Sequence, residues 1–99
     1  MKVHFTPRGR RAALAMAKWW RANRPLAADL FERELATATR QIEQQPELVP
    51  VYETVRGRAV RRALLPKTEQ HVYYSVDEAT ETVVIHVVWG ARRGRGPEL

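Results

Sequence analysis

The sequence contains no cysteine, a single serine and no long run of apolar residues. Without cysteine the chain can form neither a disulfide nor a thiolate metal site. This composition fits a reducing compartment, so a cytoplasmic location is expected. A membrane-spanning helix needs about 18 consecutive apolar residues, and no such run is present. The opening residues MKVHFTPRGRR also lack the apolar segment of a secretory signal.

Residues that usually carry catalysis or hold cofactors are sparse and scattered. The three histidines are far apart in the sequence and have no carboxylate at metal-ligand spacing (His4, His71, His86). The glycines of RGR and RRGRG lack the strand–turn–helix context of a phosphate loop. Ser75, the only serine, stands in no nucleophile motif. The sequence therefore predicts no metal site and no cofactor.

Positive charge is the strongest feature of the composition. Lysine and arginine number 17 against 11 acidic residues, which gives a net charge of +6. Two short stretches hold many of these cations: Arg56, Arg58, Arg61 and Arg62 in one, Arg92, Arg93 and Arg95 in the other. A basic surface often contacts a polyanion such as RNA, DNA or an acidic protein. The alternative is an arginine-rich surface that only meets solvent.

A short strand and a helix are expected at the beginning of the chain. Residues 2–6 alternate between apolar and polar, which is typical of a strand with one buried face. Thr6 is then the expected N-cap, and Pro7 the first residue, of a helix that extends to Asn23. Gly9 weakens the first turn of this helix by about 1 kcal/mol relative to alanine.

Pro25 is expected to begin a second helix, which Pro46 ends. Its apolar residues fall on one helical face: Leu26, Leu30, Phe31, Leu35, Ala38 and Ile42. Because the connection between the two helices is so short, they are expected to form an antiparallel hairpin.

Strand-forming segments and short polar turns alternate after the second helix. The expected strands cover residues 49–55, 59–65, 71–76 and 82–89. Their short connections predict an antiparallel meander with the helices on one face, an α+β fold. The apolar last strand is expected to be central, with Val83, Ile85, Val87 and Trp89 on one face and Val84, His86 and Val88 on the other. Residues 1–99 then form one domain, with a flexible tail at 94–99.

Arg61 and Arg62 are adjacent on an expected strand, so their side chains must leave the sheet on opposite faces. One of them then lies toward the helices, where an unpaired arginine is costly. It could pair with Glu53 on a neighbouring strand, or line a site for a phosphate or carboxylate on the open face. His86 has two similar interpretations, a buried hydrogen-bonded histidine or a member of that open-face site.

Trp19 and Trp20 cannot both lie at the centre of one narrow helical face. One is expected to enter the core and the other to lie at its margin. Since exposed tryptophan is enriched at binding hot spots, the outer tryptophan is a candidate interface residue.

Three segments resemble the RelE/ParE superfamily of bacterial type II toxins, nearer its ParE-like branch. They are VHFTPRGRRAALAMAKWW, NRPLAADLFERELATATRQIEQQP and VRRALLPKTEQHVYYSVDEATETVVIHVVWGARR, and together they span nearly the whole chain. The resemblance implies a compact toxin that binds, and is silenced by, a small cognate antitoxin in a hetero-oligomer.

Two activities occur in this superfamily. RelE-like toxins cleave mRNA in the ribosomal A site, whereas ParE-like toxins poison DNA gyrase. By resemblance, Arg61 or Arg62 matches the expected sheet arginine, and Arg92 or Arg93 the late one. The expected lysines are missing, because no lysine occurs between Gln44 and Arg62. The chain also has no tyrosine after Tyr74, and Gly90 replaces the frequent late histidine.

These departures favour a gyrase-poisoning toxin over an mRNA interferase, with an inactive relative or a basic binding module as a third alternative. No catalytic set is assigned. The residues expected to contact a target or the antitoxin are Arg61, Arg62, Arg92, Arg93 and Trp19. No membrane partner is expected.

Overall fold

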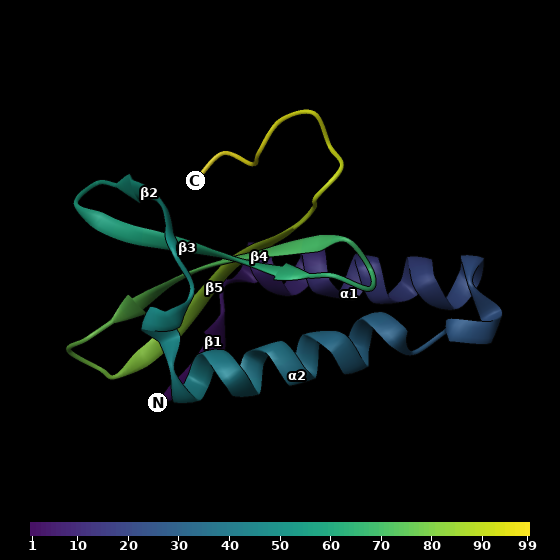
Figure 1. The fold of residues 1–99 in the computed structure, drawn as a ribbon, viewed down its shortest axis with the longest axis horizontal. Helices are drawn as coiled ribbons and strands as arrows, with labels where there is room; N and C mark the ends of the chain where they lie inside the picture. Colours follow the sequence, from purple (N-terminus) through teal and green to yellow (C-terminus); the bar gives the residue numbers. More distant parts are fainter.

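The computed structural model describes all residues from 1 to 99 as one five-stranded sheet with two helices (Figure 1). The elements in chain order are β1 (Lys2–Phe5), α1 (Pro7–Asn23), the 3₁₀ turn η1 (Pro25–Ala27), α2 (Leu30–Gln44), the 3₁₀ turn η2 (Pro46–Leu48), β2 (Val51–Val55), β3 (Arg58–Leu65), β4 (Gln70–Asp77) and β5 (Thr82–Gly90). Neither α-helix has the length and apolar character that a bilayer crossing requires.

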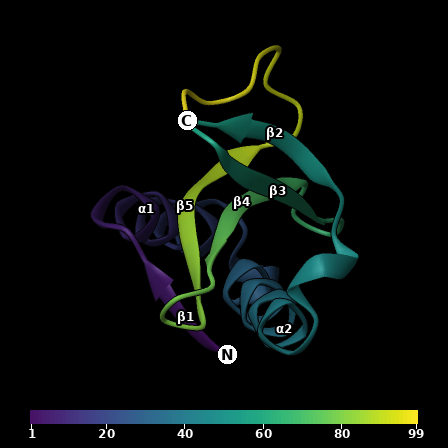
Figure 2. The same ribbon diagram turned by 90° about the vertical axis from the view of Figure 1, so that its left-hand side faces the viewer.

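The strands are ordered β1-β5-β4-β3-β2 across the sheet. The last four form an antiparallel meander, as predicted from their short connections. β1 pairs in parallel with β5, so the apolar β5 has a partner on each side. Figure 2 shows α2 on one side of the sheet and the C-terminal segment on the other. The predicted α+β fold is confirmed.

The first helix begins as the sequence predicts. The backbone N–H of Gly9 donates to the Thr6 hydroxyl at 2.9 Å, and Pro7 is the first helical residue. The Thr6 hydroxyl in turn donates to the carbonyl of His86 at 3.2 Å, so the cap also fastens α1 to β5. A Cβ on Gly9 would lie 2.5 Å from the carbonyl oxygen of Ile85. The glycine that weakens the helix is therefore what allows α1 to approach β5.

The prediction of one continuous second helix from Pro25 is wrong at its beginning. Residues Pro25–Ala27 form a separate 3₁₀ turn, and α2 starts only at Leu30. A 3₁₀ turn has three residues per turn and not 3.6, so Leu26 leaves the apolar face of α2 and is fully exposed. Phe31 and Ile42 of α2 are buried, as expected.

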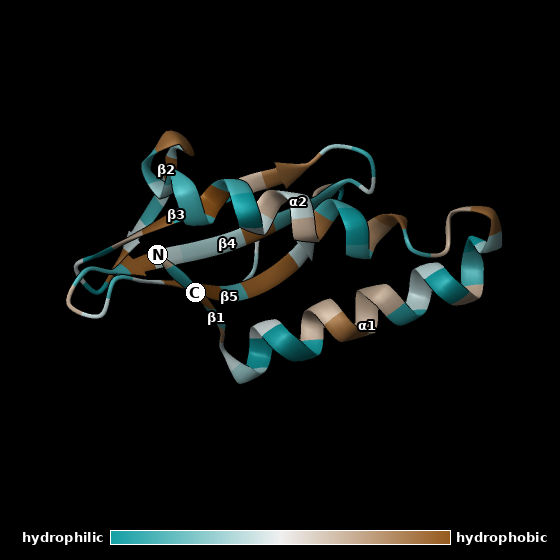
Figure 3. Ribbon diagram, turned by 90° about the horizontal axis from the view of Figure 1, so that it is seen from below, coloured by the Kyte–Doolittle hydropathy of each residue, from teal (hydrophilic) through white to brown (hydrophobic).

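The main core lies between the sheet and the helices. Its buried members are Ala17, Phe31, Ile42, Leu65, Val72, Tyr74, Val83, Ile85 and Val88. Figure 3 shows the apolar colouring along β5, which lies between β1 and β4 in the sheet. The hydroxyl of Tyr74 donates to the carbonyl of Pro46 at 2.6 Å. Burial raises the pKa of Tyr74 to about 12, so this hydroxyl keeps its proton at neutral pH.

A β-bulge in β5 changes which residues face the helices. Tyr73 of β4 is opposite Val87, while the next residue, Tyr74, is opposite Ile85, which leaves His86 as the extra residue. Val88 therefore joins the main core, and Val87 packs on the other side of the sheet. The prediction that Val87 shares a face with Ile85 is wrong, because a bulge shifts the alternation of side chains by one residue.

Candidate functional site: the open face of the sheet

The open face of the sheet is the side that carries Val60, Arg62, Tyr73, Ser75 and Val87. Val60, Tyr73 and Val87 form a small second core there, which Ala12 of α1 and Leu99 also contact. Around this apolar centre lie polar and cationic side chains that come from α1, from the strands and from the C-terminal segment. The open face is therefore a surface with an apolar centre and a polar, cationic surround.

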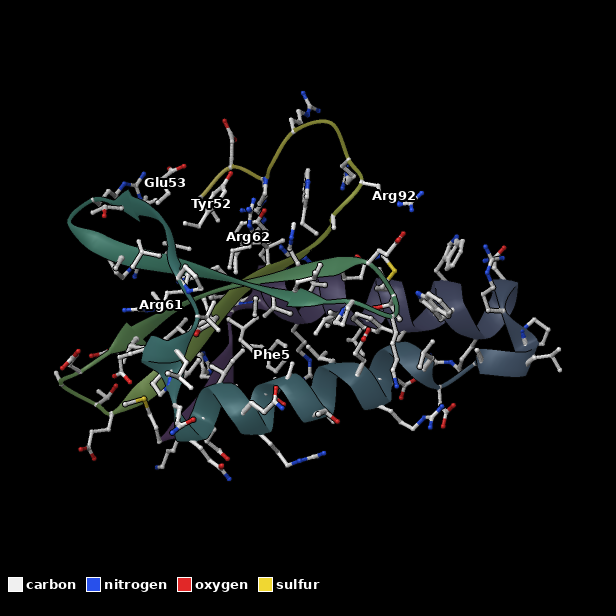
Figure 4. The ribbon with its side chains drawn as sticks, in the orientation of Figure 1. Phe5, Tyr52, Glu53, Arg61, Arg62 and Arg92 are labelled. Carbon is white, nitrogen blue, oxygen red and sulfur yellow. The ribbon has the colours of Figure 1, made fainter.

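Arg61 lies on the helix side and not on the open face. It is opposite Tyr74 of the main core, and its Nη1 donates to the carbonyls of Glu47 at 3.1 Å and Val49 at 2.5 Å. The possible ion pair with Glu53 is wrong, and Figure 4 shows the two side chains well apart. Backbone carbonyls satisfy this half-buried guanidinium, which therefore fixes η2 against β3.

Arg62 lies on the open face within a row of aromatic rings. Its guanidinium carbon is 4.4 Å from the centre of the Tyr52 ring, a cation–π contact. Tyr52 meets Tyr73 edge to face at 5.2 Å between centroids, and Tyr73 meets His71 at 6.1 Å. Burial and the charge of Arg62 both lower the pKa of His71. A neutral imidazole and an exposed guanidinium are thus held close together.

His86 and Ser75 form a hydrogen-bonded pair on the same face. The His86 Nε2 and Ser75 Oγ atoms are 2.7 Å apart. Burial lowers the pKa of His86, and the nearby charges of Arg58 and Arg8 lower it further. The histidine is both hydrogen-bonded and part of the open face, so the two interpretations of the sequence are compatible.

Sequence reasoning missed Arg8 and Arg58 as site residues. Arg58 belongs to the arginine stretch that the sequence singles out, so that stretch was a usable signal. Arg8 is on α1, and nothing in the sequence places it beside β5. The close docking of α1 against β5 through Gly9 places the charge of Arg8 where it acts on His86, while Arg58 reaches the same histidine from β3.

The C-terminal segment crosses the open face. The Trp89 indole donates to the carbonyl of Arg95 at 2.8 Å, and Arg8 donates to the carbonyl of Glu98. Leu99 packs against the small core of the open face. The guanidinium carbon of Arg93 is 3.7 Å from the centre of the Trp89 ring. The flexibility of residues 94–99 stays a prediction. Motion of this segment would have to break the contacts that Arg95, Glu98 and Leu99 make with the open face.

The remaining predicted contact residues lie elsewhere. The Nε of Arg92 pairs with Glu69 at 2.7 Å, beside the turn between β3 and β4. Trp20 packs against the main core, while Trp19 is 44% exposed, which confirms that one tryptophan is inner and one outer. The five predicted residues therefore do not form one site. No group of three or more histidine or acidic side chains is placed to hold a metal ion.

Neither a family model nor a curated protein matches this sequence. Among solved structures, the isolated RelE toxin of E. coli is similar over 95% of this chain and 87% of that chain, with a TM-score of 0.54. The chain has the fold of this RelE toxin. At 17% sequence identity the similarity shows the fold alone and does not distinguish a ParE-like branch.

Proposed function

We propose that this chain is the toxin of a type II toxin–antitoxin system. The observation that carries the proposal is the RelE/ParE fold, which extends over almost the whole chain and matches a solved toxin. Its expression should arrest bacterial growth, and co-expression of a cognate antitoxin should restore growth. Continued growth despite accumulation of folded protein would instead favour the third alternative, an inactive relative or a basic binding module.

DNA gyrase is the proposed target. The four arginines predicted to contact a target do not converge. Arg61 and Arg92 are held away from the open face, and Arg62 and Arg93 stack there on two different rings. β3 and β4 carry no lysine that could supplement them. Cleavage of a phosphodiester needs cations that converge on one phosphate. Dispersed arginines support contacts with a protein target more than they support a nuclease centre.

A supercoiling assay tests this target. Purified toxin should inhibit supercoiling by gyrase and cause cleaved DNA to accumulate. A double variant, Arg62→Gln with Arg93→Gln, should weaken inhibition because both side chains lie on the open face. Arg33→Gln is the matched control, since Arg33 is exposed on α2 and pairs with Asp29 of the same chain. Full gyrase activity at a large excess of toxin would exclude gyrase.

A second candidate function is ribosome-dependent mRNA cleavage. One observation favours it: His86 is hydrogen-bonded to Ser75 at 2.7 Å, and the positive charges of Arg8 and Arg58 act on this histidine and lower its pKa. In this mechanism His86 removes the proton of a ribose 2′-OH, whose oxygen attacks the adjacent phosphorus. The bond from phosphorus to the 5′-oxygen breaks, the 5′-oxygen leaves with a proton from water, and a 2′,3′-cyclic phosphate remains. The two arginines stabilise the negative charge that develops on the phosphate.

Mapping of mRNA ends in a translating extract tests the second candidate. Cuts at the ribosomal A site are expected with the wild-type chain and should disappear with His86→Gln. Arg40→Gln, on the outer surface of α2, is the control. Intact mRNA with active wild-type toxin would exclude this activity and leave gyrase as the proposed target.

The proposed partner is an acidic antitoxin, because its charge would complement the +6 of this chain. It is expected to lay a helix or an added strand along the helix hairpin and a sheet edge.

A further inference from the structure

A second site lies away from the open face, between the end of α1 and the turn that joins β3 to β4. It is a pocket of about 350 Å³. The residues that matter here are Trp19, Trp20 and Arg24 on one wall and Lys67, Glu69 and Gln70 on the other. None of them belongs to the open-face cluster around His86. The pocket therefore needs its own explanation.

Gln70 gives the pocket an unused hydrogen-bond acceptor. Its side chain is only 8% exposed, and its Nε2 donates to the carbonyl of Thr68 at 3.3 Å. The amide nitrogen of Gln70 therefore has a partner. The amide oxygen, Oε1, is buried and accepts no hydrogen bond. A buried unpaired acceptor destabilises a folded chain, so this oxygen needs an explanation, and a ligand that meets it once the Gln70 side chain turns toward the pocket would supply one. The partner must be a donor.

Two indole rings form the apolar part of the pocket. Trp19 and Trp20 are 5.8 Å apart between ring centroids at an interplanar angle of 73°. Trp20 is fixed by contacts with the main core, whereas Trp19 stays 44% exposed. A rigid aromatic surface beside an open pocket suits a flat aromatic group, which can stack on it.

The charges around the pocket favour an anion. Arg24 lies 5.2 Å from the centre of the Trp19 ring, and Lys67 is exposed on the opposite wall. The one acid, Glu69, is paired with Arg92 and so adds no net negative charge. Helix α1 itself contains no acidic residue. The ligand should therefore combine negative charge, a flat ring and a hydrogen-bond donor.

From these three features we propose that the pocket binds one base of a single-stranded nucleic acid. The base stacks on the exposed Trp19 ring, its exocyclic amine donates to Gln70 Oε1 when this side chain turns toward the pocket, and the flanking phosphates lie near Arg24 and Lys67. Cytosine and adenine carry such an amine, so they are the preferred bases. Stacking platforms beside cationic grooves are a common way to hold single strands. This binding does not depend on which target the toxin poisons.

Fluorescence anisotropy with a labelled oligocytidine of about eight nucleotides tests the proposal. Trp19→Ala should weaken binding about tenfold, since one stacked base is lost. Gln70→Met should weaken it severalfold, because the donor from the base then has no acceptor. The same Gln70→Met variant should keep a melting temperature close to that of the wild type, since removal of the unpaired buried oxygen offsets the loss of the long bond from Nε2 to the Thr68 carbonyl. Loss of binding is thereby separated from loss of folding.

Two variants and two competing polyanions test whether positive charge alone explains the binding of the oligonucleotide. Lys67→Gln and Arg40→Gln each remove one positive charge, and only Lys67→Gln should weaken binding beyond the general effect of charge. Polyphosphate and polyglutamate should displace the oligonucleotide poorly from the wild-type chain. The proposal is overturned if Trp19→Ala and Gln70→Met bind like the wild type. It is also overturned if polyglutamate competes as well as oligocytidine, which would identify the site as one for an acidic protein segment.

Discussion

At the residue scale, the approach of α1 to β5 depends on Gly9. Helix propensity alone predicts that Gly9→Ala stabilises the chain by about 1 kcal/mol. The added methyl would lie 2.5 Å from the carbonyl oxygen of Ile85, which is backbone and cannot move away cheaply. We therefore expect destabilisation by about 1–3 kcal/mol, measured by urea unfolding. Gly94→Ala is the control, because no atom lies within 4 Å of that position, and it should be neutral.

Arg61 and Arg62 should separate into a structural and a surface residue. Arg61→Gln removes a donor from two carbonyls and should lower the free energy of unfolding by about 1–3 kcal/mol. Arg62→Gln loses only an exposed cation–π contact with Tyr52, worth about 0.5–1 kcal/mol. Urea unfolding of both variants measures these two losses in the free energy of unfolding. Equal stability losses would contradict the assignment of the two side chains to different environments.

His86 should make stability depend on pH. Burial, with Arg58 and Arg8, lowers the pKa of the folded state below the usual 6.5. As the pH falls below 6.5, the unfolded chain takes up a proton that the folded chain does not, so stability falls until the folded-state pKa is passed. The pKa of His71 is also lowered in the folded chain, so His71 adds to the loss of stability at low pH.

Unfolding free energies measured between about pH 8 and about pH 5 should show this loss, with a smaller loss for His86→Gln. An NMR titration should show that Arg58→Gln raises the pKa of His86 toward its usual value. If the pKa of His86 is the same in Arg58→Gln as in the wild type, Arg58 does not belong to the site.

At the scale of elements, one carboxylate joins α2 to the turn between β3 and β4. Glu34 accepts hydrogen bonds from the backbone N–H groups of Lys67 and Thr68, at 2.7 and 2.9 Å, and from the Thr68 hydroxyl at 2.6 Å. Bonds to an ionised acceptor are stronger than neutral ones. Glu34→Gln should therefore lower stability by about 1.5–3 kcal/mol, measured by urea unfolding.

The control for Glu34 is Glu43→Gln near the end of the same helix, where no such bonds are made. This substitution should change stability by less than about 0.5 kcal/mol. Similar losses in both variants would mean that helix charge, and not the link to the turn, explains the effect. Since the same turn carries Lys67 and Glu69 and leads directly into Gln70 of β4, nucleotide binding by Glu34→Gln should also be weaker.

At the scale of the whole molecule, the net charge of +6 should govern association with an acidic antitoxin. The association rate should fall at least tenfold between about 50 and 500 mM salt, while the dissociation rate changes little. Stopped-flow mixing of toxin and antitoxin measures both rates. An association rate that is insensitive to salt would show that steering by charge is unimportant.

The elements of the fold were largely predictable because local signals agree. Thr6 and Pro7 mark the start of α1, and glycine or polar turns separate the strands. The 3₁₀ turn at Pro25 was not predicted, because proline begins a 3₁₀ turn as readily as an α-helix. The bulge at His86 was also missed, since an alternating apolar run gives no local sign of an inserted residue.

The sequence by itself determined the α+β order of elements, the basic character and the opposite directions of Arg61 and Arg62, because periodicity and charge are local properties. Only the tertiary structure decided which arginine faces the helices, that the charge of Arg8 acts on His86, and that Gln70, with an unpaired Oε1 atom, lines the same pocket as Trp19. Those contacts join residues far apart in the chain, and their geometry depends on how α1 packs against the sheet.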